Sequence, residues 1–316
     1  MMKNKKVLLQ TNSSDKCYVY FDKSNTLANY IINNVYTGTD GENGLYYHDG
    51  VGSYTNADQE AGDYSYRYSG ANPNNYVCFG SDEEVCPDDN LYRIIGVFDN
   101  EVKLIKNTSI GYYAWDNDEV EFTNSDDTKE KYVVPIADWI PSDSGSNEWN
   151  TSDINYHINN DYYFDTLDIN WQNKVALNEW KIGGNTNDNI LNTSIKQTFT
   201  NEIINPTEDV IYIAKIGLMY VSDYGYAVSP ENWTQNMETN DKNNYCDRNW
   251  MFKNTDEWTI TKIAGTENMV VRIHNSCSLF TNSVDGASAI RPAFFLNFNV
   301  QYGSGTGTQT DPYRIV

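Results

Sequence analysis

The chain of 316 residues carries 44 acidic side chains against 22 basic ones, which gives a formal net charge of −22. This length allows a sizeable buried core, as one large domain or two smaller ones. A charge of this sign repels phosphate backbones, so we expect no nucleic-acid partner. The acidic residues are scattered through predicted turns, which favours a solvated surface. We expect no cofactor; calcium held by loop carboxylates is the alternative, with no ligand that the spacing identifies.

Residues 1–23 are predicted to be a tail or the remnant of a longer anchor region. Their basic start, MMKNKK, is typical of an export signal, but only VLL follows before polar residues resume. A secretory core needs about 7–15 apolar residues and a transmembrane helix about 20, and the sequence offers neither. We therefore expect no signal peptide and no membrane insertion in this chain, and either a missing N-terminus or release by another route, such as lysis.

The first half of the chain predicts one short helix followed by strands and loops. In NTLANYIINNVY, residues 25–36, apolar side chains recur at helical spacing behind a polar cap. Residues 37–77 are rich in Gly, Asn and Tyr and are predicted to form loops and short strands. LYRIIGVFDNEVKLIK, residues 91–106, has two β-rich runs around an Asp-Asn dipeptide, which predicts a hairpin. Residues 116–150 are acidic and polar and end in a predicted exposed loop.

Three helices are predicted in the middle of the chain. Residues 151–164 begin with a Thr or Ser cap, residues 169–182 end at a Gly-Gly pair, and residues 193–204 are stopped by Pro206. Strand-like runs cover most of the chain after this proline. These runs are residues 209–228, 249–252, 257–263, 269–280 and 289–300, with a glycine-rich turn and a last short strand at 302–316.

Cys78 and Cys86 enclose the acidic loop FGSDEEV. Their spacing is wider than that of a zinc-binding pair and differs from the C-x-x-C of redox motifs. Gly80, Ser81 and Asp82 are turn formers that can bring the ends of the loop together. We therefore predict a disulfide, with the two Cα atoms roughly 4.4–6.8 Å apart.

The remaining cysteines are Cys17, Cys246 and Cys277. We predict a second disulfide between Cys246 and Cys277, with Cys17 unpaired within the chain. A metal site in which His274 joins Cys246 and Cys277 is the competing hypothesis, and it lacks an obvious fourth ligand. Two disulfides are typical of an oxidising compartment, so we expect an extracellular or cell-surface location.

Several segments together resemble a bacterial surface-domain family. They are NEWNTSDINYHINNDYY, AKIGLMYVSDYGYA, CDRNWMF, EWTI and AIRPAFFLN with the closing GSGTGTQTDPYRIV. The family, of unassigned function, occurs in Firmicutes and Mollicutes and is C-type-lectin-like, related to formylglycine-generating enzymes and to the variable proteins of diversity-generating retroelements. The resemblance covers roughly residues 90–316, and a leader common in the family extends it toward residue 27.

The resemblance implies an α+β fold of the C-type-lectin-like kind. Its expected form is a mainly antiparallel, twisted sheet with two or three packed helices, rich in loops and tied by disulfides. A single C-type-lectin-like domain would cover residues 24–316, with residues 24–89 as an N-terminal helix and loop extension. The helix at residues 25–36 should dock on the same body, because its apolar stripe has no other partner.

We expect a non-enzymatic binding or adhesion domain that recognises a protein or glycan ligand on another cell or particle. A phage or retroelement-type receptor-binding protein is one alternative, and an enzyme, either a hydrolase or a formylglycine-generating-like oxidase, is another. The sequence contains no phosphate-binding loop and no strand–elbow–helix nucleophile motif. An oxidase would need Cys246 and Cys277 as reduced, copper-holding thiols. A glycosidase needs only two carboxylates, which leave no distinctive pattern.

Four residues are candidates for ligand binding: Tyr224, Trp250, Trp258 and Arg291. Trp250 and Trp258 lie across a predicted hairpin, either in the core or exposed to stack on a sugar or peptide. Arg291 either anchors an anionic ligand group or pairs with a buried carboxylate or backbone carbonyls. Tyr224, with Asp223, either forms a turn at a strand end or lines a site. In each case we favour the structural interpretation, and no residue is assigned a catalytic or metal-binding role.

Overall fold

The computed structural model describes residues 25–51, 59–117, 145–160, 163–186, 190, 192–234, 236–237 and 245–316. The predicted tail, Cys17 and most of the predicted loop at 116–150 lie outside these residues. The α-helices are α1 (Leu27–Tyr30), α2 (Asp153–Asn159), α3 (Ile169–Gln172), α5 (Ile195–Phe199) and α6 (Val221–Tyr226). Two π-helical turns, Ile31–Val35 and Thr200–Ile204, extend α1 and α5.

The strands form two larger sheets and two small ones. One sheet has the order β1-β2-β4-β5-β14-β9 with β3 on β4, another has the order β12-β11-β10-β13-β6, and β7-β8 and β15-β16 are two-stranded. The strands are β1 (Leu45–Tyr47), β2 (Tyr66–Tyr68), β3 (Tyr76–Cys78), β4 (Leu91–Phe98), β5 (Glu101–Lys106), β6 (Gly111–Ala114), β7 (Asn178–Lys181), β8 (Ile211–Ala214), β9 (Ile216–Gly217), β10 (Glu257–Lys262), β11 (Met269–Ile273), β12 (Leu279–Ser283), β13 (Ala287–Ile290), β14 (Ala293–Phe295), β15 (Tyr302–Ser304) and β16 (Arg314–Ile315).

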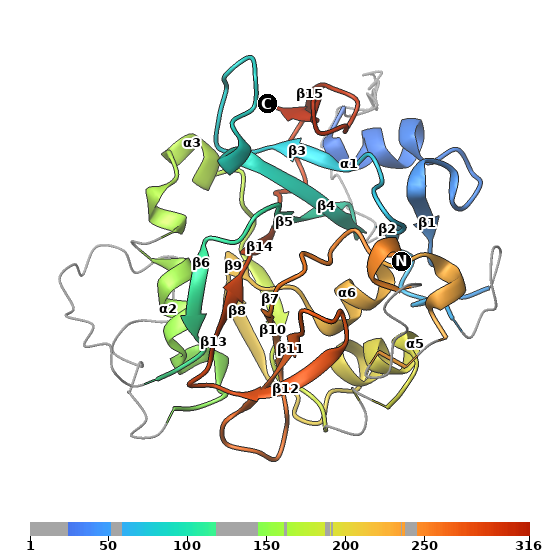
Figure 1. Cartoon of the computed structure of the whole chain (residues 1–316). Coiled ribbons are helices and arrows are strands. Elements are labelled where there is room, and N and C mark those ends of the chain that lie inside the picture. Colours follow the sequence, from blue (N-terminus) through green and yellow to red (C-terminus); the bar gives the residue numbers. More distant parts are fainter. Residues whose placement is uncertain are drawn as a thin grey trace, which may run out of the picture.

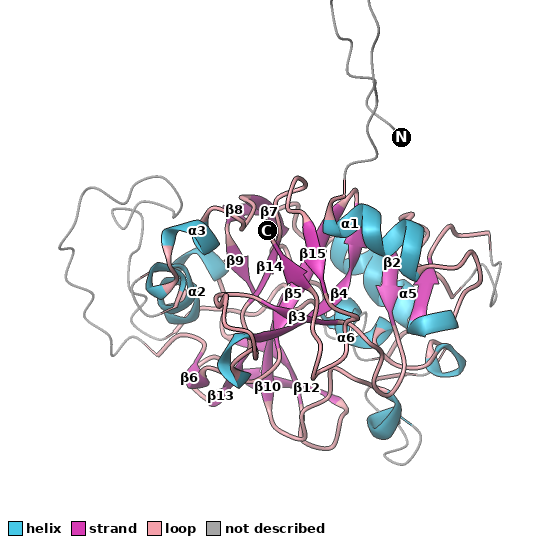
Figure 2. Ribbon diagram, turned by 90° about the horizontal axis from the view of Figure 1, so that it is seen from above, coloured by secondary structure: helices cyan, strands magenta, loops and turns pink. Residues whose placement is uncertain are grey.

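Pairing between these strands is mostly antiparallel, and β10 with β13 is a parallel pair. Figure 1 shows the chain running through both sheets, and Figure 2 shows α2 and α3 on one side of the strands with α1 and α5 on the other. The predicted α+β class is therefore confirmed.

The hairpin predicted at residues 91–106 is formed by β4 and β5. Asp99 and Asn100 make the connection, with φ of 49° and 69°. Two left-handed residues in succession match the right-handed twist of the strands, and Asp and Asn tolerate that conformation better than most residues. The local sequence is therefore sufficient to specify this turn.

The predicted helix at residues 169–182 is wrong beyond its first turn. Helix α3 ends at Gln172, and β7 pairs with β8, so that Trp180 lies opposite Tyr212. The buried indole of Trp180 donates from Nε1 to the Ala214 carbonyl at 3.2 Å. The spacing of the large side chains in this segment is compatible with either a helix or a strand. Pairing of β7 with the distant strand β8 selects the strand. The helix predicted at 151–164 is also shorter, since α2 covers Asp153–Asn159.

The strand-like run at residues 209–228 is only partly a strand. After β8 and β9 the chain turns into α6, which contains Asp223 and Tyr224 rather than placing them in a turn at a strand end. The Asp223 carboxylate accepts a hydrogen bond from the Tyr220 backbone N–H at 2.9 Å, which caps the helix. Residues 249–252, also predicted as a strand, form only an isolated bridge at Asn249, opposite Val228, followed by a turn at residues 250–251.

The N-terminal helix docks on the rest of the protein, as expected. The Leu27 backbone N–H donates to the Val300 carbonyl at 2.9 Å, and the Tyr30 ring stacks on Tyr302 with centroids 3.6 Å apart. Figure 1 accordingly shows α1 beside β15. The buried side chains of α1 belong to the same hydrophobic cluster as those of both large sheets.

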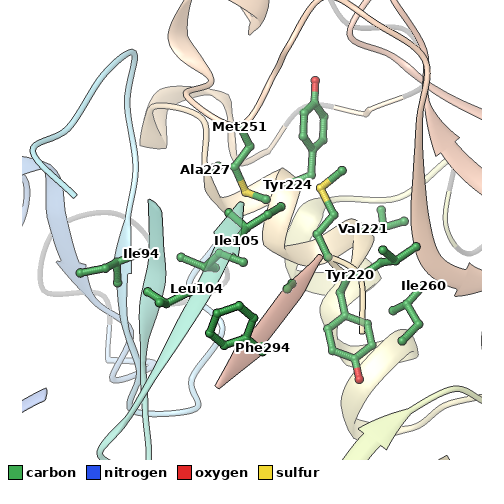
Figure 3. Packing of buried hydrophobic residues seen from close by; sticks show 14 of the residues in the cluster. Ile94, Leu104, Ile105, Tyr220, Val221, Tyr224, Ala227, Met251, Ile260 and Phe294 are labelled. Atoms are coloured by element: carbon green, nitrogen blue, oxygen red, sulfur yellow. The ribbon is translucent and has the colours of Figure 1, made fainter. Parts of the chain in front are cut away.

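The centre of that cluster lies where β5, β14 and α6 meet. Figure 3 shows Leu104, Ile105 and Phe294 gathered near Tyr220 and Val221. Each fully buried aliphatic or aromatic side chain of this kind contributes about 1.5–3 kcal/mol relative to an exposed one. Two of these elements also carry charged residues described below, Lys103 on β5 and Asp223 on α6.

Both predicted disulfides are confirmed. Cys78 and Cys86 have Cα atoms 5.8 Å apart, and Cys246 and Cys277 have Cα atoms 5.6 Å apart. The second bond consumes the two sulfurs that the competing metal hypothesis combined with His274, so that hypothesis is wrong. Such bonds indicate an oxidising environment. Among the described residues, no helix has the length and apolar character needed to span a membrane.

Candidate ligand-binding pocket

A pocket of about 220 Å³ opens among β2, β5, β7, β14 and α6. Four aromatic rings contribute to its wall, and six charged side chains lie among them. The lining residues are Asp63, Arg67, Phe98, Lys103, Glu179, Lys181, Phe199, Ile203, Tyr220, Ser222, Asp223 and Phe295. Apolar walls with a few converging polar groups are typical of ligand sites.

Lys103 enters the pocket from β5, where it lies opposite Phe295 of β14. Its side chain is only 2% exposed. The ammonium lies 4.5 Å from the ring centroid of Tyr220, 5.2 Å from that of Trp180 and 5.3 Å from that of Phe295. These π faces replace part of the hydration that the cation has lost. Burial lowers the pKa of Lys103, and the Asp223 carboxylate opposes that shift.

Arg67 enters from β2 and is similarly enclosed by rings. Its guanidinium carbon lies 4.7 Å from the ring centroid of Phe98, 4.9 Å from that of Tyr226 and 5.2 Å from that of Phe199. Its Nε donates to the Ser65 hydroxyl at 2.9 Å. A planar guanidinium held on both its edge and its faces has little rotational freedom, so Arg67 is a fixed donor.

Asp223 joins the two cations from the first turn of α6. Its Oδ2 is 2.6 Å from the Lys103 ammonium and also accepts from the Tyr220 N–H. Its Oδ1 lies 3.8 Å from Arg67 Nη1, which is an ion-pair distance but too long for a hydrogen bond. Arg67 also pairs with a second carboxylate, that of Asp63, whose Oδ2 lies 2.5 Å from Arg67 Nη2. The pocket therefore contains a buried, largely neutralised charge network.

A second buried carboxylate, that of Glu202, fixes the start of α6. It accepts from the backbone N–H groups of Val221 and Ser222, each at 3.0 Å, and from the Thr261 hydroxyl. Burial raises the pKa of Glu202, while these hydrogen bonds oppose the rise. Because Glu202 anchors the helix N-terminus, it also holds Asp223 in place at the pocket.

The four predicted ligand-binding residues do not line this pocket. All are buried: Tyr224 and Trp258 at 0%, Arg291 at 1% and Trp250 at 3% exposure. Trp250 and Trp258 do not face each other across a hairpin, since Trp250 lies in a turn and Trp258 in β10 opposite Arg272. In this structure none of the four forms an exposed recognition surface.

Each of the three aromatic side chains instead makes an internal hydrogen bond. The Tyr224 hydroxyl donates to the Cys277 carbonyl at 2.9 Å. The Trp250 indole donates to the Tyr68 carbonyl at 2.8 Å, and the Trp258 indole to the Tyr113 carbonyl at 3.0 Å. These bonds join distant parts of the chain, which agrees with the structural interpretation favoured from the sequence.

The sequence reasoning missed Arg67 and Lys103. A signal for Lys103 existed, because EVKLIK places a lysine inside a strand whose neighbours Val102, Leu104 and Ile105 are all buried. Lysine is almost never fully buried unless it is paired. For Arg67, in a short strand between two tyrosines, the local pattern carries no comparable signal.

A second hollow, of about 310 Å³, lies beside the Cys78–Cys86 loop and the end of the chain. Its acidic residues Glu83 and Glu84 are exposed, and Arg314 reaches across to the Glu84 carbonyl at 2.9 Å. Exposed loop carboxylates are hydrated and poorly fixed, whereas the charged groups around Asp223 are buried and held by several contacts. We therefore take the pocket at Asp223 as the candidate site.

No protein-family model, curated protein or solved structure matches the chain. Its function has to follow from the chemistry of its residues. Among the described residues, no group of three or more His, Cys, Asp or Glu side chains is arranged to hold a metal ion. The pocket offers fixed hydrogen-bond donors, a fixed acceptor and aromatic walls, which suit recognition of a polar group.

Proposed function

We propose that the chain is a non-enzymatic, extracellular binding domain of the C-type-lectin-like kind, which holds part of a protein or glycan ligand in the pocket around Asp223. The observation that carries this proposal is the buried network of Arg67, Lys103 and Asp223 within aromatic walls. Charged groups that are already paired and held rigidly lose little freedom when a ligand arrives. The ligand would be displayed on another cell or particle.

The location is argued from the disulfides and from the sequence resemblance. The Cys78–Cys86 and Cys246–Cys277 bonds favour an oxidising compartment. The segments that resemble a bacterial surface-domain family include CDRNWMF, which contains Cys246, and the run around Asp223. The resemblance therefore extends to one disulfide cysteine and to part of the pocket. A surface domain that binds a ligand accounts for both observations.

The enzyme alternatives have less support from the site. Cys246 and Cys277 are bonded to each other, so this form offers no thiolate pair for a copper oxidase. Lys103 is engaged by Asp223, which holds it as a cation rather than as a nucleophilic amine. A phage or retroelement-type receptor-binding protein would use the same pocket and differs only in the particle that carries it.

Screening the full chain on glycan and protein arrays tests this proposal. Ile203→Trp places bulk at a pocket-lining position without removing a charge, and Ile204→Trp makes the same change one residue on, at a side chain 57% exposed. We expect captured ligand to bind Ile203→Trp about tenfold more weakly, equivalent to ~1.4 kcal/mol, and Ile204→Trp to bind as the parent does. Equal capture by parent and Ile203→Trp would show that the pocket is not the site.

A further inference from the structure

The charge of the pocket restricts which ligand group it can accept. Arg67 and Lys103 face Asp63 and Asp223. Lys181 and Glu179 also line the pocket, and the Lys181 ammonium lies 3.8 Å from the exposed carboxylate of Asp209. The lining residues thus have as many positive as negative charges. A charged ligand group would leave one charge uncompensated in a buried site, which is unfavourable. The pocket is therefore suited to a neutral group.

The hydrogen-bonding capacity of the network is not fully used by the described residues. Lysine has three N–H donors, and Lys103 makes one hydrogen bond, to Asp223. Arg67 uses Nε on Ser65 and Nη2 on Asp63, while its Nη1 lies 3.8 Å from Asp223 Oδ1. This donor and this acceptor are close enough that one oxygen lying to the side of the pair can be within hydrogen-bond distance of both.

A hydroxyl group beside this pair suits both atoms, because its oxygen can accept from Arg67 Nη1 while its hydrogen is donated to Asp223 Oδ1. A second hydroxyl next to it could accept from Lys103. An amide cannot donate and accept through one atom, and a carboxylate cannot donate at all. Adjacent hydroxyls on a rigid frame are the defining chemistry of a sugar ring.

The walls and size of the pocket agree with the same ligand. Phe98, Phe199, Tyr220 and Phe295 line the pocket with apolar ring atoms, and the C–H groups of a sugar ring can pack against the parts of these rings that Arg67 and Lys103 leave uncovered. The volume of about 220 Å³ is below the roughly 300–1,000 Å³ of pockets for drug-sized ligands. One sugar unit is therefore a better match than a longer oligosaccharide segment.

We infer that the pocket binds a single neutral monosaccharide unit of a glycan, with one hydroxyl bridging Arg67 and Asp223 and a neighbouring hydroxyl accepting from Lys103. This inference rests on the proposed binding function and names its ligand class. A protein ligand would offer at most one hydroxyl per side chain, so the paired recognition favours the glycan.

The test uses a glycan array divided into neutral, sialylated or sulfated, and amino-sugar groups, with a protein array alongside. We expect the parent and Ile204→Trp to capture neutral glycans equally well, and Ile203→Trp to capture them about tenfold more weakly. If the parent captures only charged glycans or only proteins, and Ile203→Trp weakens that capture, the inference is overturned and the proposed binding function stands. Capture insensitive to Ile203→Trp, or no capture on either array, would overturn the proposed site itself.

A second measurement covers the case in which Ile203→Trp fails to fold. Saturation-transfer NMR with the unmodified full chain and the methyl glycoside of the best-captured neutral sugar should show stronger transfer to ring C–H protons on one face of the sugar. That pattern is expected because aromatic rings line the pocket. Uniform or absent transfer would count against the inference.

Discussion

Arg291 and Glu257 form a buried, two-pronged ion pair. Arg291 Nε lies 2.6 Å from Glu257 Oε1, Nη2 lies 3.0 Å from Oε2, and Nη2 also donates to the Met251 carbonyl at 2.7 Å. Glu257 begins β10 and lies opposite Ala289 of β13, the strand that immediately precedes Arg291. The ion pair thus supports the parallel contact between β10 and β13.

The first prediction concerns this pair. Arg291→Met should lower the free energy of unfolding by about 3–5 kcal/mol, because it leaves the buried Glu257 carboxylate uncompensated. The double variant Arg291→Met with Glu257→Met should recover much of that loss, since it removes both charges together. Urea unfolding of the three proteins measures the effect. A double variant as unstable as the sum of both single variants would contradict the pairing argument.

The second prediction concerns the disulfides. The Cys246–Cys277 bond closes a sequence separation of 31 residues and the Cys78–Cys86 bond one of 8. From loop-closure entropy, the longer ring should raise the free energy of unfolding by about 3–4 kcal/mol and the shorter ring by about 2–3 kcal/mol. Replacing both cysteines of a pair by serine should therefore destabilise the protein more for the longer ring. Peptide mapping of the non-reduced protein should recover both bonds, and free thiol at these four positions would refute the pairing.

The third prediction is a loss of stability in acid caused by His48. Its Nδ1 accepts from the Ala61 N–H at 3.1 Å, so the neutral ring carries its proton on the buried Nε2. Burial, assisted by the Arg67 charge, lowers the pKa of His48 to about 3, although Asp63 and Asp49 act in the opposite direction. The unfolded chain takes up this proton below about pH 6.5 and the folded protein only near pH 3.

Stability should therefore fall as pH decreases from about 6.5 toward 3, by several kcal/mol at about 1.4 kcal/mol per pKa unit. His48→Phe should flatten this dependence, because the ring packs against Tyr226 and Trp233 and can be replaced by another ring. His157→Phe, at a half-buried histidine, is the matched control and should leave most of the slope. An unchanged slope in His48→Phe, measured by denaturant unfolding between pH 4 and 7, would refute the assignment.

The fourth prediction concerns Lys253, whose ammonium donates to Asn107 Oδ1 at 3.1 Å. Burial lowers the pKa of Lys253 to about 7, with the Arg291 and Arg93 charges acting in the same direction. Between about pH 7 and 10.4 the unfolded chain keeps a proton that the folded protein has released, so this residue makes stability rise with pH across that window.

Lys253→Met should consequently raise stability near pH 6 and have little effect above pH 10. Lys196→Met, at a partly exposed lysine on α5, serves as the control and should leave the rise in place. Chemical denaturation at a series of pH values reports the difference. A destabilising effect of Lys253→Met at pH 6 would contradict the prediction.

Features that depend on neighbouring residues followed from the sequence by itself. The β4–β5 hairpin is specified by Asp99 and Asn100, which accept left-handed backbone angles. Helix α5 begins where Ser194 accepts from the Gln197 N–H, within the helix predicted at residues 193–204. The cysteine spacing predicted the Cys78–Cys86 bond, because the loop between them is short and contains turn-forming residues. In each case the determining contacts span only a few residues.

The tertiary structure decided the features that depend on distant partners. The spacing of Trp180 and its neighbours fits a helix as well as a strand, and the pairing of β7 with β8 selects the strand. The pocket could not be read from any local motif, because Lys103 and Asp223 are 120 residues apart. A buried charge is stable only where folding brings its counter-charge and its rings together, so such a site exists in the fold and not in any segment of the chain.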